Sequence, residues 1–276
     1  MTVSAQYYVD HGMKKVDGWL SRDAAELIRA VDAAQRDIGA TGSVAEIGIH
    51  HGKLFILLAL LRRPGEGALA VDLFEDQGSN IDGSGYGDRD AFEKALRLAG
   101  LSPDEITIVA DSSLDLEPEF VTSAVGPIRL FSIDGGHTAE ITRSDLILAE
   151  RTIDPRGVVI LDDVANSEWP GVVTGIAAYL AGGGTLVPFV VSPQKTLLAR
   201  EEYATGFRRY LEGQHSANFL KQDEFFSHPV AVFCDSPHWL RAQLANSGIY
   251  QRVKENPLVQ QVRPKVLSMV DRGSAG

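Results

Sequence analysis

Short apolar runs alternate with longer amphipathic segments along the first 200 residues. Five runs predict strands, at Val44–Ile49, Ala68–Leu73, Ile106–Ala110, Ile128–Ile133 and Gly157–Leu161. Helical spacing follows the first four strands, at Lys53–Leu61, Arg89–Ala99, Glu117–Ala124 and Ala139–Arg151. Such alternation is typical of a mostly parallel sheet with helices on both faces. We therefore predict an α/β fold with a doubly wound, Rossmann-like sheet.

The segments that flank this alternation add elements at both ends. Residues 19–38 have helical spacing, and Ser21 is the predicted N-cap. On the C-terminal side, Val172–Leu180 predicts a helix, and Thr185–Val191 and Lys195–Ala199 predict two strands. The three residues between those strands suit a tight turn. We expect a C-terminal antiparallel hairpin on the sheet.

The pattern weakens beyond residue 200. Residues 201–222 predict a charged helix, Pro229–Cys234 predicts an edge strand, and the last ten or so residues predict a frayed tail. We divide the chain into an N-terminal helical appendage at 1–40, a core at 41–200 and a C-terminal appendage at 201–276.

Composition and charge narrow the class of protein. The 276 residues carry a formal net charge of -11, which argues against a nucleic-acid binder, because such proteins need a basic face. The single cysteine, Cys234, allows no intramolecular disulfide and is expected to be a small buried residue. The uncharged stretch 169–194 contains proline and glycine breaks that a membrane-spanning helix would lack, and no signal peptide is visible. We expect a soluble cytoplasmic protein without a membrane partner.

Carboxylates follow two of the predicted core strands directly. Asp134 begins the sequence Asp-Gly-Gly-His, which ends at His137, and Asp162 and Asp163 end the next strand. Ligands of open α/β sheets bind outside the carboxyl ends of the strands. If the strands are neighbours, three carboxylates meet there and repel one another unless a cation relieves the repulsion. Three alternatives remain open: Asp134 could cap the next helix, the aspartate pair could form an ordinary turn, and His137 could be a polar loop residue.

Three earlier strand ends suggest an adenosine site. The first strand leads through Glu46 to Gly48 and Gly52, where a turn into a helix lets a ligand approach the backbone. Asp72 ends the second strand, 24 residues after Gly48, and an acidic residue there suits two ribose hydroxyls. Asp111 and Ser112 follow the third strand and could meet an adenine amino group. Each signal is weak alone, since a glycine or an aspartate at such a turn is often structural.

Together these motifs resemble those of the class I S-adenosylmethionine-dependent methyltransferases. The chain is most similar to the bacterial metal-dependent O-methyltransferases of the macrocin O-methyltransferase and cephalosporin-hydroxylase-like group, over roughly residues 40–200. The resemblance implies S-adenosylmethionine as cofactor, contacted by Glu46, Gly48, Gly52, Asp72, Asp111, Ser112 and Asp134. It also implies Mg²⁺, or another divalent cation, on Asp134, Asp162 and Asp163.

The implied reaction is methyl transfer to a hydroxyl group of a small molecule, a sugar or a natural product. A cation lowers the pKa of bound hydroxyls and orients them. His137 is the candidate base, since a histidine titrates near neutral pH, and Asp134 is the second catalytic candidate. Trp169 could line the acceptor pocket or pack in the core.

Other interpretations and features stay open at this point. The glycine-rich segment 75–88 could be a lid or a solvated connection. His50 and His51 could be structural or could line the substrate pocket. The alternatives to this function are a non-catalytic S-adenosylmethionine-binding module, a nicotinamide-dependent oxidoreductase, and a methyltransferase of nucleic acid or protein. The missing G-x-G-x-x-G motif disfavours the oxidoreductase, and the charge disfavours nucleic acid. A homo-oligomer is compatible with the sequence, which does not specify the oligomeric state.

Overall fold

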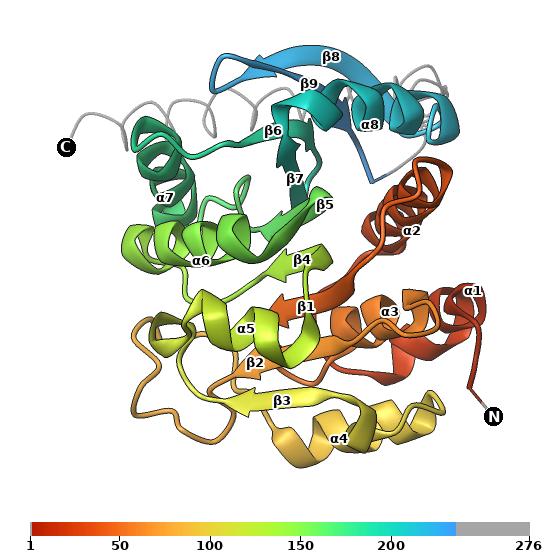
Figure 1. The fold of residues 1–276 in the computed structure, drawn as a ribbon, viewed down its shortest axis with the longest axis vertical. Coiled ribbons are helices and arrows are strands. Elements are labelled where there is room, and N and C mark those ends of the chain that lie inside the picture. Colours follow the sequence, from red (N-terminus) through yellow and green to blue (C-terminus); the bar gives the residue numbers. More distant parts are fainter. Residues whose placement is uncertain (1, 236–276) are drawn as a thin grey trace, which may run out of the picture. The chain divides into compact units, whose positions relative to one another are not determined.

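The computed structural model describes residues 2–235. Its core is a nine-stranded sheet with the strand order β3-β2-β1-β4-β5-β7-β6-β9-β8, seen in Figure 1 with β3 at the bottom and β8 at the top. The strands are β1 Ser43–Ile47, β2 Ala68–Asp72, β3 Thr107–Ala110, β4 Ile128–Ile133, β5 Ile153–Asp162, β6 Leu186–Val191, β7 Lys195–Arg200, β8 Phe219–Phe225 and β9 His228–Phe233.

The first five strands are parallel, as predicted. The chain reverses direction at the predicted hairpin, since β7 pairs antiparallel with both β5 and β6. The α/β class, the doubly wound parallel part and the C-terminal hairpin are therefore confirmed.

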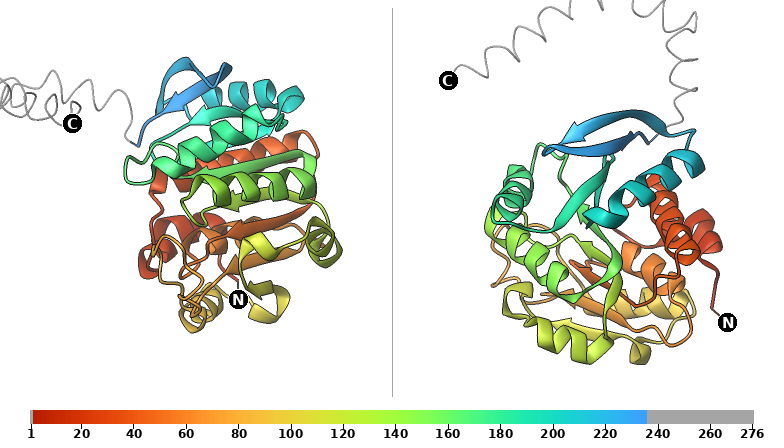
Figure 2. Two further views of the ribbon diagram at one scale, coloured as in Figure 1. Left: turned by 90° about the vertical axis from the view of Figure 1, so that its left-hand side faces the viewer. Right: turned by 45° about the horizontal axis from the view of Figure 1, so that its top comes forward.

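Helices cover both faces of this sheet, as the turned views of Figure 2 show. One face carries α2 Arg22–Asp37, α3 Lys53–Leu61, α4 Arg89–Leu98 and α8 Glu201–Gln214. The other carries α5 Pro118–Val125, α6 Ala139–Thr152 and α7 Pro170–Ala181. The N-terminal segment adds three short helical pieces, α1 Ala5–Tyr7, η1 Tyr8–Gly12 and η2 Met13–Lys15, and η3 Pro103–Glu105 and η4 Ser113–Asp115 flank β3.

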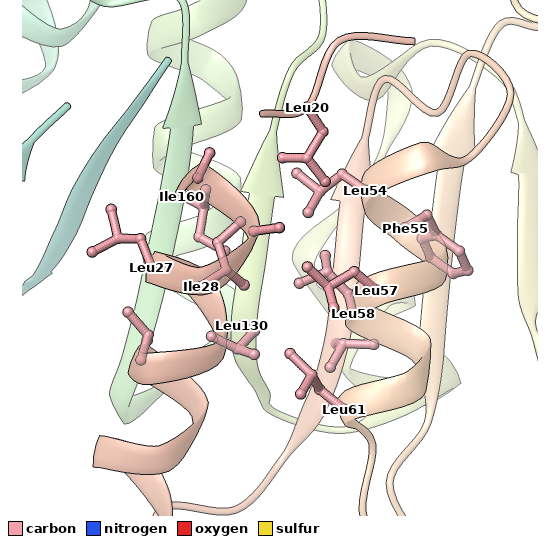
Figure 3. Close-up of a cluster of buried hydrophobic side chains, with 14 of the residues drawn as sticks. Leu20, Leu27, Ile28, Leu54, Phe55, Leu57, Leu58, Leu61, Leu130 and Ile160 are labelled. Carbon is pink, nitrogen blue, oxygen red and sulfur yellow. The ribbon is translucent and has the colours of Figure 1, made fainter. Parts of the chain in front are cut away.

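Sequence patterns explain where these helices lie. Helix α2 begins after Ser21, whose hydroxyl oxygen accepts the N–H of Ala24 at 3.1 Å, so the predicted N-cap is confirmed. Its apolar stripe, which includes Leu27 and Ile28, lies beside α3 over β4 and β5 (Figure 3). Helix α3 is almost wholly apolar because nearly all of its residues are buried. The packing of α2 and α3 over the sheet holds the turn between β1 and α3 in place.

The weaker pattern beyond residue 200 gave two errors. The helix predicted over 201–222 ends at Gln214, and strand β8 occupies Phe219–Phe225. The strand predicted at the edge, β9, instead lies between β6 and β8. Both errors have one cause: β8 is solvent-exposed on most of its length and lacks the apolar alternation of a half-buried strand. Cys234 is buried, as expected, whereas the predicted tail lies outside the described residues.

None of the helices in the described residues is long and apolar enough to cross a membrane. The uncharged stretch that raised this question forms α7, β6 and the turn to β7.

Candidate active site

A large cavity lies at the carboxyl ends of β1 to β5. Its volume is about 760 Å³, and residues from all five strand ends line it. The predicted residues that line it are Gly48, Asp72, Asp111, Ser112, Asp134, His137, Asp162 and Asp163. Glu46 and Gly52 do not. The sheet therefore brings together both halves of the predicted site, the adenosine half and the acidic half.

Asp72 supports the turn that follows β1. One of its carboxylate oxygens accepts the backbone N–H groups of Ile49, at 2.5 Å, and His50, at 2.8 Å. The other oxygen accepts the N–H of Phe74 at 2.6 Å. A carboxylate has about four acceptor positions. Asp72 therefore shapes the turn and keeps about one position for a ligand in the cavity.

Gly48 allows two strand ends to meet. Its φ is +85°, and a Cβ atom placed there would lie 1.8 Å from the carbonyl oxygen of Asp134. Any side chain at this position would push β1 and β4 apart. Gly52 has a different neighbour, because a Cβ there would strike the ring of Phe92 at 2.4 Å. Glycine at 52 is thus explained by the packing of α3 against α4.

Asp111 and Ser112 are held by local contacts. The carboxylate of Asp111 accepts the N–H of Ser112 at 2.8 Å, and the hydroxyl oxygen of Ser112 accepts the N–H of Leu114 at 3.2 Å. Ser112 thereby caps the short helix η4. The side chain of Asp111 is exposed toward the cavity, where a ligand could reach it.

A buried lysine lies among the carboxylates of the acidic half of the site. Lys195, on β7, is fully buried and lies opposite Asp162 in the β5–β7 register. Its ammonium group donates to Asp162 and lies 3.7 Å from Asp134. Burial opposes the charge of Lys195, but these carboxylates outweigh it and raise the pKa of the lysine, so it stays protonated. The sequence analysis missed this internal cation.

The positive charge of Lys195 does not neutralise all the carboxyl groups around it. Low solvation and the charge of Asp162 raise the pKa of Asp134 well above its usual range, although Lys195 acts in the opposite direction. Burial raises the pKa of Glu46 to about 8. One oxygen of Glu46 has no hydrogen-bond partner among the described residues. Glu46 lies near Lys195 and Asp162 but outside the lining of the cavity.

Three side chains form a group that could hold a metal ion. Ligand atoms of Asp134, His137 and Asp163 all lie within 4.8 Å of one another. Asp162 is not in this group, because its carboxylate pairs with Lys195. The φ of Asp163 is +58°, an uncommon value for a residue with a side chain, and this turn directs the two neighbouring aspartates to different partners.

His137 lies between two carboxylates and a tryptophan ring. Its Nδ1 is 2.9 Å from Asp82, its Nε2 is 3.2 Å from Asp163, and its ring stacks on Trp169 with 4.2 Å between centroids. Burial alone would lower the pKa of His137, but the hydrogen bonds to Asp163 and Asp82 outweigh burial and raise it. His137 is therefore a fixed part of the cavity wall, unlike a solvated loop residue.

Two alternatives from the sequence are resolved by local contacts. Thr138 caps α6, since its hydroxyl oxygen accepts the N–H of Ile141 at 3.2 Å, so Asp134 has no capping role there. Trp169 lines the cavity against His137 rather than packing wholly in the core.

Aromatic side chains also gather at the turn after β1. The rings of His50 and His51 stack with centroids 4.0 Å apart, and Trp19 lies 5.2 Å from His50. Trp19 and His50 line the cavity, and Trp19 is 73% exposed. Burial lowers the pKa of His50.

Residues 45–164 match a family model described as a methyltransferase domain. These residues form a methyltransferase domain. The matched range runs from β1 through Asp163, and it contains every strand end that lines the cavity. The resemblance to methyltransferases is thereby confirmed for residues 45–164.

One solved structure shows a similar fold, and two further solved structures are similar to a lesser degree. The O-methyltransferase NovP is 16% identical, with a TM-score of 0.51 over 64% of this chain and 80% of NovP. A TDP-rhamnose 3'-O-methyltransferase of calicheamicin biosynthesis is also 16% identical, over 72% of this chain and 88% of that one, with a TM-score of 0.48. TomG from Streptomyces achromogenes, an O-methyltransferase of tomaymycin synthesis, is 18% identical, over 72% and 91%, with a TM-score of 0.49. No match was found among curated proteins.

Proposed function

We propose that this methyltransferase transfers the methyl group of S-adenosylmethionine to a hydroxyl group of a small molecule. The proposal is supported mainly by one observation: the same cavity is lined by both halves of the predicted site. Asp72 and Asp111 lie on one side, and Asp134, His137 and Asp163 lie on the other. S-adenosylmethionine would lie along the first side, with its ribose at Asp72 and its adenine near Asp111 and Ser112. The acceptor would lie against the second side.

The residues of the second side suit proton removal from a hydroxyl. His137 presents Nε2 toward Asp163, and we propose that this nitrogen accepts the acceptor's proton as the methyl group arrives. The ion pair with Lys195 holds Asp162 in place at the end of β5. Stacking on Trp169 limits the tilt of the imidazole. Positioning of this kind lowers the barrier of a displacement reaction by several kcal/mol.

A divalent cation also fits the donor set. Of the group Asp134, His137 and Asp163, the two carboxylates offer oxygen ligands that Mg²⁺ or Mn²⁺ accepts, and Nε2 of His137 stays free to take a proton. When bound, such a cation lowers the pKa of an acceptor hydroxyl and orients it. We propose Asp134 and Asp163 as its carboxylate ligands and assign Asp162, through Lys195, to holding the adjoining turn.

The charge of the cavity favours one class of acceptor. Seven carboxylates line it, those of Asp72, Asp82, Asp111, Asp134, Asp162, Asp163 and Glu168, and no lysine or arginine of the described residues does. A phosphorylated or carboxylated acceptor would meet repulsion there. We propose a neutral or cationic acceptor such as a sugar, an amino sugar or a phenol, and not a nucleic acid.

The role of His137 is tested by His137→Ala. General bases contribute about 10²–10⁴-fold, so kcat should fall by that factor while the affinity for S-adenosylmethionine stays the same. The assay follows labelled methyl groups into a panel of sugars, polyketides and phenols, and calorimetry gives the affinity. Retention of more than about a third of wild-type kcat would show that another group takes the proton.

The cation is tested by direct binding of Mn²⁺ in a calorimeter. Asp163→Ala should abolish binding, while Asp104→Ala, an exposed carboxylate on η3 far from the lining, should bind as the wild type does. In the same protein, exhaustive EDTA treatment should stop turnover and leave S-adenosylmethionine binding largely intact. Full activity after EDTA, or Mn²⁺ binding unaffected by Asp163→Ala, would remove the cation from the proposal.

A further inference from the structure

The connection from β2 to α4 places a carboxylate on the far side of His137. Asp82, near the middle of this connection, accepts the backbone N–H of His137 at 2.6 Å and lies 2.9 Å from its Nδ1. Ser84 donates its hydroxyl to the other oxygen of Asp82 at 2.6 Å. The side chains of Asp82 and His137 are each only 11% exposed. The pair is thus enclosed, and both oxygens of Asp82 are engaged.

We propose that Asp82 is the positioning residue of the active-site histidine. A carboxylate accepts hydrogen bonds and donates none, so Asp82 requires a proton on Nδ1 of His137. In the neutral ring only one nitrogen carries a proton, and the shorter contact, 2.9 Å from Nδ1 to Asp82 against 3.2 Å from Nε2 to Asp163, favours Nδ1 and leaves the lone pair on Nε2. Nε2 is the atom that faces Asp163 and the cavity. Asp82 thereby selects the tautomer whose Nε2 can accept a proton.

Other contacts limit the ring to one orientation. Trp169 lies almost parallel to the imidazole, with an interplanar angle of 18°. The bond from the backbone of His137 to Asp82 fixes the start of the side chain relative to the carboxylate. The same hydrogen bonds, led by the backbone N–H of His137, outweigh burial and lower the pKa of Asp82 to about 2, so the carboxylate is charged. A charged acceptor also stabilises the imidazolium that forms after proton transfer.

The segment that carries Asp82 also borders the cofactor side of the cavity. Gln77, Asn80 and Ile81 line the cavity, and Gly87 packs so closely on Asp72 that a Cβ there would lie 2.5 Å from its carboxylate. The connection from β2 to α4 therefore carries Asp82, the partner of His137, and also contacts Asp72, the proposed ribose ligand. The sequence left open whether the segment 75–88 is a lid or a solvated connection; on this inference it completes the base.

The tautomer can be measured directly. Imidazole ¹⁵N resonances distinguish a protonated from an unprotonated ring nitrogen, and loss of the signal in His137→Gln assigns the residue. At alkaline pH, where the ring is neutral, the wild-type protein should carry the proton on Nδ1. In Asp82→Ala the proton should move to Nε2, while Asp82→Asn, which keeps one acceptor oxygen, should retain a mixture. A wild-type His137 with its proton on Nε2, or an unchanged tautomer in Asp82→Ala, would overturn the inference.

Kinetics provide the second readout. Carboxylates that orient a histidine contribute from about 10-fold to about 10⁴-fold, so kcat of Asp82→Ala should fall by at least about 10-fold while the S-adenosylmethionine Kd stays within twofold. The matched control is Asp76→Ala, an exposed carboxylate on the same connection whose partner is Ser79 at 2.8 Å; both quantities should stay at wild-type values. Equal losses in both variants would mean that the segment is only structural.

The inference rests on the proposed function for the role of His137, but different results would contradict the inference and the function. Absence of methyl transfer by the wild-type protein to every acceptor would count against the function. The ¹⁵N measurement needs no turnover and decides the tautomer alone.

Discussion

At the scale of single residues, the aspartates at the strand ends were predictable and their partners were not. A carboxylate directly after an apolar run can be read from the sequence, because the end of a parallel strand faces the ligand edge. The role of Lys195 could not be read in the same way. Its contact with Asp162 depends on the β5–β7 register, and residues 33 positions apart meet only once that register is known. The available signal was a lysine at the start of a strand whose middle, Leu197 to Ala199, is apolar.

Asp82 was missed for a related reason. It lies in a polar, glycine-rich segment whose sequence suits a solvated connection equally well. Its contact with His137 joins two loops 55 residues apart. Side chains on loops have no periodicity to place them, so only the folded chain shows this pair.

A residue-scale prediction concerns Asp72. In Asp72→Ala, the one hydrogen bond to a ribose hydroxyl that Asp72 has room for should be lost; it is worth about 0.5–1.5 kcal/mol, so the affinity for S-adenosylmethionine should fall roughly 2- to 13-fold. Calorimetry measures the affinity. Because Asp72 also supports the N–H groups of Ile49 and His50, the thermal midpoint should be recorded for the same variant. Affinity within twofold of wild type would contradict the assignment.

At the scale of elements, the periodicity of apolar residues was enough to predict a helix or strand wherever one of its faces is buried. Helix α3 has the predicted bounds, and α2 begins at the predicted cap. Strand β8 was missed because exposed residues dominate it. Strand β4 shows a further limit: Arg129 within it is fully buried and pairs with Asp32 at 2.9 Å and Glu66 at 3.0 Å. The sequence pattern alone does not distinguish such a buried ion cluster from a surface charge.

Helix α6 gives a prediction for stability against pH. Asp145 is 1% exposed, its oxygens have no hydrogen-bond partner among the described residues, and burial raises its pKa to about 7. The unfolded chain would lose this proton near pH 4. Between these values the folded state binds the extra proton, so this group makes folding less favourable as the pH rises from about 4 to about 7.

Asp145→Asn removes that dependence. The stability of the variant relative to wild type should rise across the same interval, by at least about 1.4 kcal/mol if the pKa differs by one unit or more. Urea unfolding at a series of pH values provides the curve. A constant difference between the two proteins from pH 4 to pH 8 would show that Asp145 ionises normally in the fold.

At the scale of the whole molecule, the order of the strands creates the site. The sheet reads outward from β1 to β3 on one side and from β4 to β5 on the other, so the chain reverses its direction of winding between β1 and β4. A crevice at such a switch point is where open α/β sheets bind ligands. The sequence predicted this cavity because it predicted the alternation of strands and helices. It did not predict the acceptor, and the cavity is also lined by Trp19 from the N-terminal segment and Gln194 from the hairpin turn.

The central claim is that this one cavity passes a methyl group from S-adenosylmethionine to a hydroxyl oxygen. The most direct test incubates the protein and S-adenosylmethionine carrying a labelled methyl group with a neutral sugar or phenol panel, and locates the label in the product by mass spectrometry. We predict a label on oxygen, formed by wild type and reduced about 10²–10⁴-fold in His137→Ala. A label on nitrogen or carbon, or equal transfer by His137→Ala, would contradict the account.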